Sequence, residues 1–382
     1  MRSDGPRSRP HPLPFARPDI GGDEIAEVIA TLESGWLATG PRAERFAADF
    51  AAYVGADFAV PVSSATAGLH LALLANGVRP GDEVITTPMT FVATLNAIVH
   101  CGAVPVLADI DPGTRNLRTE EVERRITRRT RAIVPVHFAG QPVDLDPLLD
   151  LAAASGLAVI EDAAHAVGAE YRGRKIGSLA GTTAVFSFHP NKNMTTGEGG
   201  IITTADEEVF RTADRLRFHG LDGTQPAVPD MPLPGFKYNI TDIQAALGIH
   251  QLRRLEGFLA ERERLALRYT KALSDLPGLL LPAVADYPMR HAWHLYAPLL
   301  DIDRLPIDRA TFANRLREHG IATGYHYRAA HLMSYYADRF GWTPQDFPEA
   351  SFVSDRTVSL PLFPGLSDND QDDVIAALRR VL

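Results

Sequence analysis

One lysine, Lys192, lies in a polar loop that directly follows an apolar, strand-like segment. The segment runs from Thr183 to Phe188, and the loop ends in a group of glycines at Gly200. About thirty residues upstream, Leu157–Asp162 predicts a second strand, which ends on a carboxylate. Because ligands of open α/β sheets bind beyond the carboxyl ends of strands, Lys192 and Asp162 can reach the same crevice. A buried lysine near a carboxylate indicates imine chemistry, although each residue alone is more often a surface charge or a turn or cap residue.

A second feature is a candidate anion site. Ser63–Gly68 lies between a predicted strand and a predicted helix, and its small residues let the backbone approach a ligand closely. Exposed N–H groups and the dipole at a helix N-terminus favour a phosphate. The hydroxyls of Ser64 and Thr66 add donors. The alternative is a plain Ser/Thr helix cap, which is the more common role for such a segment taken alone.

Two further side chains can face a bound aromatic ring. Phe91 follows the turn Thr86–Pro88 and can stack on such a ring. His165 lies three residues after Asp162, and the two would share a face if a helical turn follows the strand. The carboxylate can then keep a ring nitrogen protonated, while the imidazole hydrogen-bonds a phenolic oxygen. The alternatives are an ordinary core phenylalanine and a structural histidine.

Rival site types are disfavoured by their spacing. Gly173–Ser178 resembles part of a phosphate loop but lacks the G-x-x-x-x-G-K-[ST] pattern, and no G-x-G-x-x-G follows the first strand. Two histidine pairs, His291 with His294 and His326 with His331, lack the spacing and cysteine partners typical of zinc sites. We therefore expect no catalytic metal.

Bulk properties limit the classes of protein. The 382 residues are 45% hydrophobic and 22% charged, which is ordinary for a globular protein with a large core. A net charge of −9 argues against nucleic-acid binding, and the chain has no apolar run long enough for a membrane span. The single cysteine, Cys101, favours a reducing compartment, so we expect a cytoplasmic protein. Met1–Pro14 lacks a signal core and is expected to be a flexible arm.

Between residues 57 and 204, short β-rich runs alternate with helical patterns, which predicts an α/β fold with a mainly parallel, doubly covered sheet. Pro61 indicates an edge or entry position for the first strand, and Thr119 is expected to cap a helix. The predicted strands are 58–62, 83–86, 104–107, 132–136, 157–162, 183–188 and 200–204. The predicted helices are 66–75, 91–100, 119–127 and 145–155.

After residue 205 the pattern changes. We expect a helix over 206–218, a proline-rich loop over 221–234 and a long helix over 241–273. The remainder mixes strands (294–300, 357–360) with helices (308–319, 368–382). This organisation predicts a large α/β domain over residues 1–250 and a smaller α+β domain over residues 251–382.

Six segments, which occur in the same order along the chain, resemble motifs of the DegT/DnrJ/EryC1/StrS family of pyridoxal-phosphate-dependent sugar aminotransferases. They are Ser63–Gly68, Thr90–Thr94, Glu161–Ala166, Phe186–Gly200, Arg217–Gly220 and Gly235–Asp242. The match runs from about Leu13 to the C-terminus. Within the family, segments including Ser34–Trp36 and His291–His294 are most similar to UDP-4-amino-4-deoxy-L-arabinose–oxoglutarate aminotransferases. The loop 221–234 departs from that type, and Phe91 stands where those enzymes have tryptophan.

The resemblance implies an aspartate-aminotransferase-like fold (PLP fold type I) and a role for each matching residue. Lys192 corresponds to the lysine that binds pyridoxal 5'-phosphate covalently and later moves the proton. Asp162 corresponds to the partner of the pyridine nitrogen, and His165 to the partner of the ring hydroxyl. The other implied cofactor contacts are Ser64, Ala65, Thr66 and Ser187 around the phosphate, Phe91 on the ring, and Asn239, which reaches the neighbouring subunit's cofactor in a homodimer. Candidate substrate contacts are Trp36, His219, Tyr325, His326 and Arg328.

The resemblance also implies a reaction. A nucleotide-linked keto-sugar, most simply a 4-keto sugar such as a UDP-4-keto-pentose or a dTDP- or UDP-4-keto-6-deoxyhexose, would receive nitrogen from L-glutamate, which leaves as 2-oxoglutarate. Some family members are dehydratases with histidine in place of the lysine, so Lys192 favours aminotransfer. A non-catalytic sugar- or cofactor-binding regulator is the other alternative. The sugar, the nucleotide and the pathway (lipid A and lipopolysaccharide, surface polysaccharide or antibiotic sugars) stay open.

Overall fold

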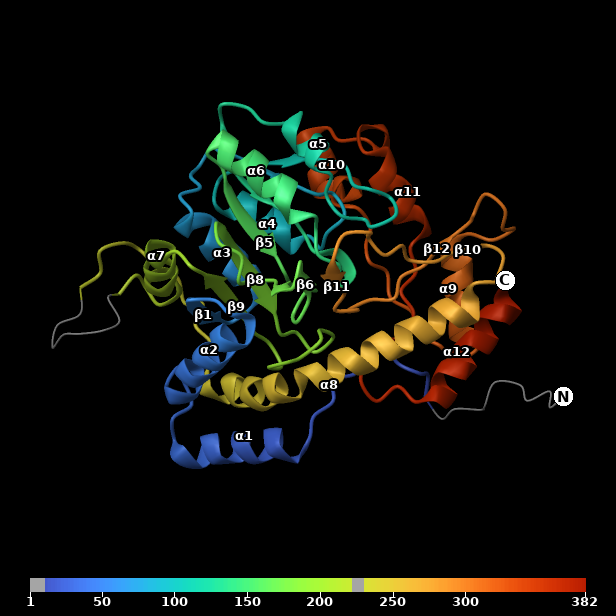
Figure 1. Cartoon of the computed structure of the whole chain (residues 1–382), viewed down its shortest axis with the longest axis horizontal. Coiled ribbons are helices and arrows are strands. Elements are labelled where there is room, and N and C mark those ends of the chain that lie inside the picture. Colours follow the sequence, from blue (N-terminus) through green and yellow to red (C-terminus); the bar gives the residue numbers. More distant parts are fainter. Residues whose placement is uncertain (1–10, 222–229) are drawn as a thin grey trace.

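The computed structural model describes residues 11–221 and 230–382, and a seven-stranded sheet forms its centre (Figure 1). The strand order is β1-β9-β8-β5-β4-β2-β3. Strands β3, β2, β4, β5 and β8 run parallel, whereas β9 and β1 are antiparallel to their neighbours. The bounds are β1 Phe58–Val62, β2 Glu83–Thr86, β3 Val104–Leu107, β4 Thr130–Val134, β5 Ala158–Asp162, β8 Thr182–Ser187 and β9 Gly200–Thr204. The predicted mainly parallel sheet is confirmed, and Pro61 lies on an edge strand as expected.

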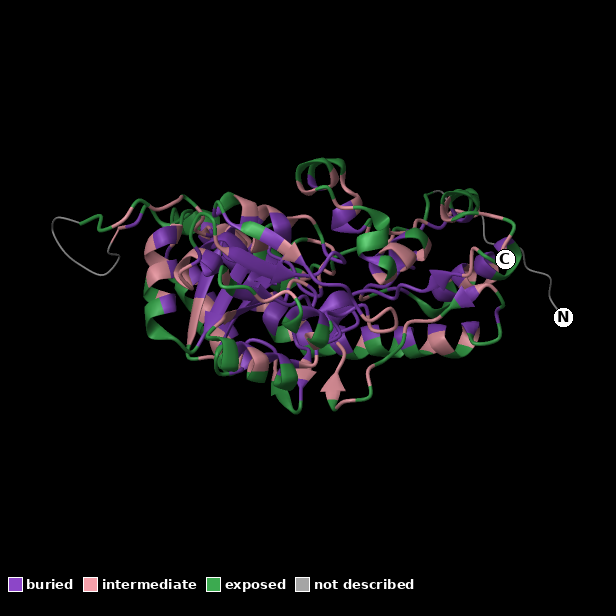
Figure 2. Ribbon diagram, turned by 90° about the horizontal axis from the view of Figure 1, so that it is seen from above, coloured by how far each residue is buried: buried purple, intermediate pink, exposed green. Residues whose placement is uncertain are grey.

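Helices cover both faces of this sheet because alternate strand residues are apolar on both sides. In β8, Ala184 and Phe186 belong to one core cluster, whereas Val185 belongs to another. The first cluster includes residues of α2 (Pro41–Val54), α6 (Leu145–Ser155) and α8 (Asp242–Leu273). The second includes residues of α3 (Ala65–Ala75), α4 (Ala93–His100) and α7 (Glu207–Arg217). Figure 2 shows the sheet as the buried centre of the molecule, with exposed residues on the outer sides of the helices.

The long helix α8 connects the two ends of the molecule (Figure 1). It begins after Thr241, whose hydroxyl accepts the N–H of Gln244 and caps the helix. The buried carboxylate of Asp242 accepts the N–H groups at the start of α2, from Gly40, Arg42 and Ala43. These bonds satisfy N–H groups that have no partner within α2 itself. Helix α1 (Gly22–Ser34) packs on α8 as well.

The C-terminal part has its own core cluster, to which the second half of α8 contributes Leu265 and Tyr269. Its helices are α9 Arg309–Glu318, α10 Ser334–Phe340, α11 Pro348–Arg356 and α12 Asp368–Val381. The remaining short elements are α5 Thr119–Glu123, β6 Glu170–Tyr171, β7 Arg174–Lys175, β10 Leu279–Leu280, β11 Met289–Arg290 and β12 Leu299–Leu300. Since α8 crosses residue 250 without a break, the division into domains 1–250 and 251–382 stays a prediction. None of the helices in the described ranges has the length and apolarity that a bilayer crossing requires.

Several local predictions were wrong. The expected strand 294–300 is reduced to β12, and 357–360 makes only single β-bridges, such as Thr357 with Leu299, so no continuous ladder forms. Thr119 does not cap α5, because the carbonyl of Arg118 already accepts the first helical N–H groups.

The expected N-terminal arm and the proline-rich loop are only partly described. Residues 1–10 of the arm lie outside the described residues, but Leu13 is buried and donates its N–H to the carbonyl of Gly320. The end of the arm is therefore packed rather than flexible. Residues 222–229 of the loop predicted over 221–234 also lie outside the described part of the chain.

Packing of α8 on α2 yields a stability prediction. A Cβ added at Gly248 would lie 2.7 Å from Cε2 of Phe46, whereas one added at Gly257 on the same helix meets nothing within 4 Å. We expect Gly248→Ala to lower the free energy of unfolding by about 1–3 kcal/mol through overpacking. Gly257→Ala should raise it by about 0.5–1 kcal/mol, because alanine loses less backbone entropy in a helix. Urea titrations of both variants measure this; equal effects would contradict the packing described.

Candidate active site

The sheet brings several chain segments to one edge. Strands β5 and β8 are parallel neighbours, so their last residues, Asp162 and Ser187, lie at the same end. Gly200 pairs with Ser187 on one side and with Val62 on the other, which brings the start of α3 to this end too. A Cβ at Gly200 would lie 2.7 Å from the backbone nitrogen of Ala65, so glycine is needed for this close approach.

A cavity of about 340 Å³ lies at this edge. This volume falls within the range of small-molecule sites. Its lining includes eight residues that the sequence predicted for a cofactor site and one predicted for substrate: Ser64, Ala65, Thr66, Phe91, Asp162, His165, Ser187, Lys192 and His326. Segments more than two hundred residues apart in the chain thus meet in one hollow.

Asp162 is the buried acid of the cavity. Its Oδ2 accepts the hydroxyl of Thr94 at 2.7 Å, and its Oδ1 accepts the N–H of Ala164 at 3.2 Å. Burial raises the pKa of Asp162, while the bonds from Thr94 and Ala164 and the charge of Lys192 lower it. Because a carboxylate offers about four lone-pair positions, Asp162 can accept a further N–H from a ligand in the cavity.

Lys192 lies in a loop held from both sides. The Nδ2 of Asn193 donates to the carbonyl of Ala292 at 2.8 Å, and the N–H of Thr195 donates to Oε1 of Gln251 on α8 at 3.3 Å. Burial lowers the pKa of Lys192 to about 8, against the opposing effect of Asp162. A substantial fraction of the amine is therefore unprotonated at slightly alkaline pH, which is the form that attacks a carbonyl.

His165 is held in one tautomer by the backbone. The N–H of Ala139 donates to its Nδ1 at 3.2 Å, and burial keeps the pKa of His165 well below its usual range. The neutral ring therefore carries its proton on Nε2 and donates it to Oη of Tyr327 at 2.9 Å. The chain after Asp162 forms turns rather than the helical turn we considered, yet both side chains still line the cavity.

The start of α3 caps its own helix and also lines the cavity. The Oγ of Ser64 accepts the N–H of Ala67 at 3.1 Å and so caps the helix, as the alternative interpretation held. Ser64, Ala65 and Thr66 nevertheless line the cavity. The helix N-terminus points its unpaired N–H groups and the positive end of its dipole there, which suits a phosphate.

Phe91 lies at the mouth of the cavity with 57% of its surface exposed. Its ring centroid lies 5.9 Å from that of Tyr327. It is therefore not an ordinary core phenylalanine, which would be buried. An exposed aromatic face beside a polar cavity can cover one side of a flat ligand.

Of the five residues predicted for substrate contact, all of them in the described part of the chain, only His326 lines the cavity. Tyr325 and Arg328 are its near neighbours in sequence, but their side chains bind backbone carbonyls outside the cavity lining. The Oη of Tyr325 donates to the carbonyl of Ser354 at 3.0 Å. Exposed Arg328 donates to the carbonyl of Leu332 at 2.7 Å.

Asn239, Trp36 and His219 lie on the surface outside the cavity lining. Asn239 accepts from Nζ of Lys237 at 2.7 Å and donates to the hydroxyl of Thr39. Trp36 is 56% exposed, and its Nε1 donates to the carbonyl of Thr39 at 3.2 Å. His219 is exposed with a φ of 60°.

Tyr327 and Thr94 contact site residues but were not identified from the sequence. Tyr327 pairs with His165 across 162 positions of sequence, and only its adjacency to His326 could have drawn attention to it. Thr94 belongs to the segment that drew attention to Phe91, but its bond to Asp162 could not be inferred from spacing. Glu198 also lines the cavity and follows the Lys192 loop.

The groups that line the cavity fit pyridoxal phosphate. An acid, an amine, a neutral imidazole, an aromatic face and a helix N-terminus surround one cavity of suitable size. Within the described residues, no group of three His, Cys, Asp or Glu side chains is arranged to hold a metal ion.

Comparison with known proteins agrees with this chemistry. Residues 18–379 match the DegT/DnrJ/EryC1/StrS aminotransferase family. The spore coat polysaccharide biosynthesis protein SpsC of Bacillus subtilis (strain 168) is 47% identical over 388 residues, covering 98% of both chains. DesV of S. venezuelae, solved in complex with a ketimine intermediate, is 35% identical with a TM-score of 0.89, covering 97% of this chain and 98% of that one.

Spr1654 of Streptococcus pneumoniae has been solved in a PLP form and a PMP form. The PLP form is 32% identical with a TM-score of 0.90 and covers 97% of this chain and 98% of that one. The similarity over nearly the whole chain confirms the aspartate-aminotransferase-like fold, PLP fold type I, that the resemblance implied.

The electrostatics of the cavity predict how Lys192 reacts. In cofactor-free protein, its acetylation rate should reach half its maximum near pH 8. Because the charge of Asp162 raises the pKa of Lys192, Asp162→Asn should shift this midpoint to lower pH. Mass spectrometry of the Lys192 peptide over a pH series measures both. A midpoint that stays the same or rises in Asp162→Asn would contradict the coupling.

Proposed function

The chain belongs to the DegT/DnrJ/EryC1/StrS aminotransferase family, and we propose that it transfers the amino group of L-glutamate to a nucleotide-linked keto-sugar. The family and its structural relatives are sugar aminotransferases, and the PLP and PMP forms of one relative imply pyridoxal 5'-phosphate as cofactor. The observation that carries the proposal is the position of Lys192 beside Asp162 in one cavity.

Each part of the cofactor has a matching group in the cavity. Asp162 would accept the N–H of the pyridinium, and the start of α3 with Ser187 would bind the phosphate. Phe91 would cover a face of the ring. His165 offers an Nε2–H donor, at present directed to Tyr327, for the ring hydroxyl. Lys192 would form the covalent link.

Bound pyridoxal phosphate supplies an electron sink for the carbanion formed at the reacting carbon. Buried Asp162 would stabilise a positive charge on the ring, because desolvation strengthens the interaction. With its amine free, Lys192 would be a base of suitable strength. Its Nζ removes the proton from the α-carbon of glutamate and, in the second half-reaction, delivers a proton to the sugar carbon that gains nitrogen.

For the sugar we propose a 4-keto substrate, such as a UDP-4-keto-pentose or a dTDP- or UDP-4-keto-6-deoxyhexose. His326 lines the cavity and can contact the sugar. The relative SpsC is named for polysaccharide biosynthesis, which supports a role in making an amino sugar for a surface polymer. We also propose a cytoplasmic location, where nucleotide-linked sugars are made.

We infer a homodimer in which a second copy completes the site. Trp36, His219 and Asn239 lie outside the cavity lining of the single chain, yet the family resemblance gives Asn239 a cofactor contact in the neighbouring subunit. Exposed apolar side chains nearby, including Leu37 and Phe218, suit a protein interface. In this arrangement these residues would reach the partner's cavity.

Adding pyridoxal phosphate to the protein should produce a visible yellow absorbance band, and adding L-glutamate should then bleach it. Lys192→Ala should lose the band, because the covalent link cannot form. Lys271→Ala, which removes an exposed lysine on α8, is the matched control and should behave as the wild type does. A colourless wild-type protein, or a band retained in Lys192→Ala, would refute the proposed function.

The substrate class needs a separate test. Starting from glutamate-bleached enzyme, a panel of UDP-, dTDP- and GDP-linked 4-keto and 3-keto sugars should include one that restores the band, because the sugar takes the amino group from the cofactor. Only 4-keto sugars are expected to do so. Restoration by 3-keto sugars alone would overturn the assignment of the carbonyl position.

A further inference from the structure

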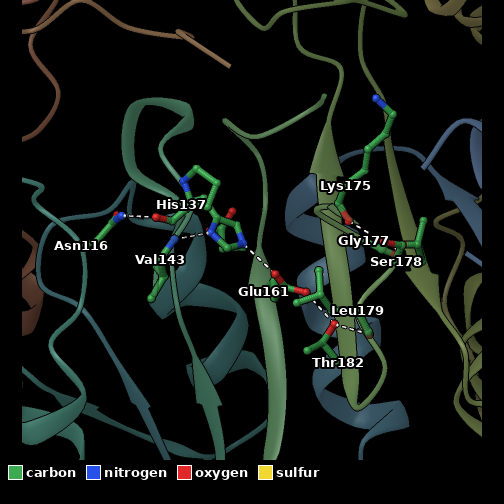
Figure 3. Close-up of polar contacts among 12 residues, drawn as sticks. Asn116, His137, Val143, Glu161, Lys175, Gly177, Ser178, Leu179 and Thr182 are labelled. Carbon is green, nitrogen blue, oxygen red and sulfur yellow. Dashed lines mark hydrogen bonds and ion pairs between the residues drawn. The ribbon is translucent and has the colours of Figure 1, made fainter. Parts of the chain in front are cut away.

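A buried polar network connects His137, Glu161 and Thr182 (Figure 3). Its centre is His137, which follows β4, and Glu161 in β5; both side chains are fully buried. Glu161 immediately precedes Asp162, and because successive strand residues point to opposite faces, its side chain lies on the far side of the sheet from the cavity.

The hydrogen bonds of this network define its protonation. The N–H of Val143 donates to Nδ1 of His137 at 3.0 Å, so the neutral ring carries its proton on Nε2. Nε2 donates to Oε2 of Glu161 at 2.8 Å. The hydroxyl of Thr182, at the start of β8, donates to Oε1 of Glu161 at 2.6 Å. Each carboxylate oxygen therefore has a donor.

The network anchors the turn formed by residues 137–143, which contacts two cavity residues. The backbone N–H of His137 donates to the carbonyl of Asp162 at 3.2 Å. Two residues on, the N–H of Ala139 donates to Nδ1 of His165. Ala139 has a φ of 58°, a left-handed conformation that a non-glycine residue adopts only when its surroundings enforce it.

A turn that contains a left-handed alanine needs strong contacts to hold it in place. A buried carboxylate can provide one, but its desolvation costs free energy. An apolar pair of similar volume in place of His137 and Glu161 would avoid the desolvation of the acid. The polar pair is explained by the hydrogen bonds that the turn makes to Asp162 and His165. If Ala139 N–H moved away, Nδ1 of His165 could take the proton, and Nε2 would then accept from Tyr327 instead of donating.

We propose that His137 and Glu161 are positioning residues of the active site: they anchor the 137–143 turn so that Ala139 holds His165 in its Nε2–H tautomer. The consequence for catalysis rests on the proposed function, because it is there that His165 presents a donor to the ring hydroxyl of the cofactor. The tautomer itself does not depend on that function.

The test uses the full-length protein labelled with ¹⁵N at its imidazole nitrogens, with and without pyridoxal phosphate. The His165 signals are identified by their loss in His165→Gln. In the wild-type protein they should report protonation on Nε2, and an Nδ1–H form without cofactor would overturn the proposal before any anchor variant is made.

Paired variants then separate the two bonds of His137. His137→Gln keeps a donor near the position of Nε2 and should preserve the His165 signals. His137→Asn keeps an acceptor near Nδ1 but cannot reach Glu161, so it should shift them. Glu161→Gln keeps an acceptor for His137 and should stay close to wild type, whereas Glu161→Leu should behave as His137→Asn does.

In active enzyme, the two disruptive variants, His137→Asn and Glu161→Leu, should lower kcat/KM on the order of tenfold or more, the scale of one buried hydrogen bond.

Val374→Ala controls for general destabilisation, because Val374 is fully buried in α12, in the C-terminal core cluster. It should leave the His165 signals unchanged. The proposal is overturned if His137→Asn keeps the wild-type signals, or if Val374→Ala shifts them equally. If the disruptive variants do not fold, the tautomer of His165 in the wild-type protein and in the Glu161→Gln variant still tests the proposal. Loss of activity in the wild type, with the expected His165 tautomer intact, would count against the proposed function and not against the anchor.

Discussion

The proposed chemistry depends on the electrostatic coupling between Lys192 and Asp162, which line the same cavity. Desolvation lowers the pKa of the amine and raises that of the carboxyl, while their mutual attraction opposes both shifts. An exposed pair would be screened and would stay near ordinary values. The coupling therefore requires a fold that brings both residues to one edge of a sheet and keeps them partly out of solvent.

The fold meets this requirement through a few specific contacts. The parallel pairing of β5 with β8 sets the ends of the two strands side by side, and Gly200 admits the start of α3 close to them. The bond from Thr195 to Gln251 ties the Lys192 loop to α8, which also connects the two core regions. On the opposite face, the His137–Glu161 pair holds the turn that contacts Asp162 and His165. The reactive groups are thus held by backbone and buried polar contacts on both faces of the sheet.

Much of this arrangement could be predicted from the chain alone. The apolar runs 157–162 and 183–188 predict strands, and the rule that ligands bind at the carboxyl ends of strands predicts that Lys192 and Asp162 lie close together. The resemblance to the family supplied the role of each residue. Contacts that join distant segments could not be found this way, because no local pattern connects Tyr327 with His165 or Thr94 with Asp162. The prediction of strands over 294–300 and 357–360 was wrong for a similar reason. Their apolar residues are buried, but the two segments meet at single β-bridges rather than along a continuous ladder.

The attachment of the cofactor to Lys192 is the central claim, and the chain makes it unusually simple to test because it contains only four lysines: Lys175, Lys192, Lys237 and Lys271. Borohydride reduction of the protein mixed with pyridoxal phosphate, followed by peptide mass spectrometry, identifies the lysine that carries the cofactor. We predict one equivalent of label, on Lys192. Labelling that is spread over the other three lysines, or that spares Lys192, would contradict it.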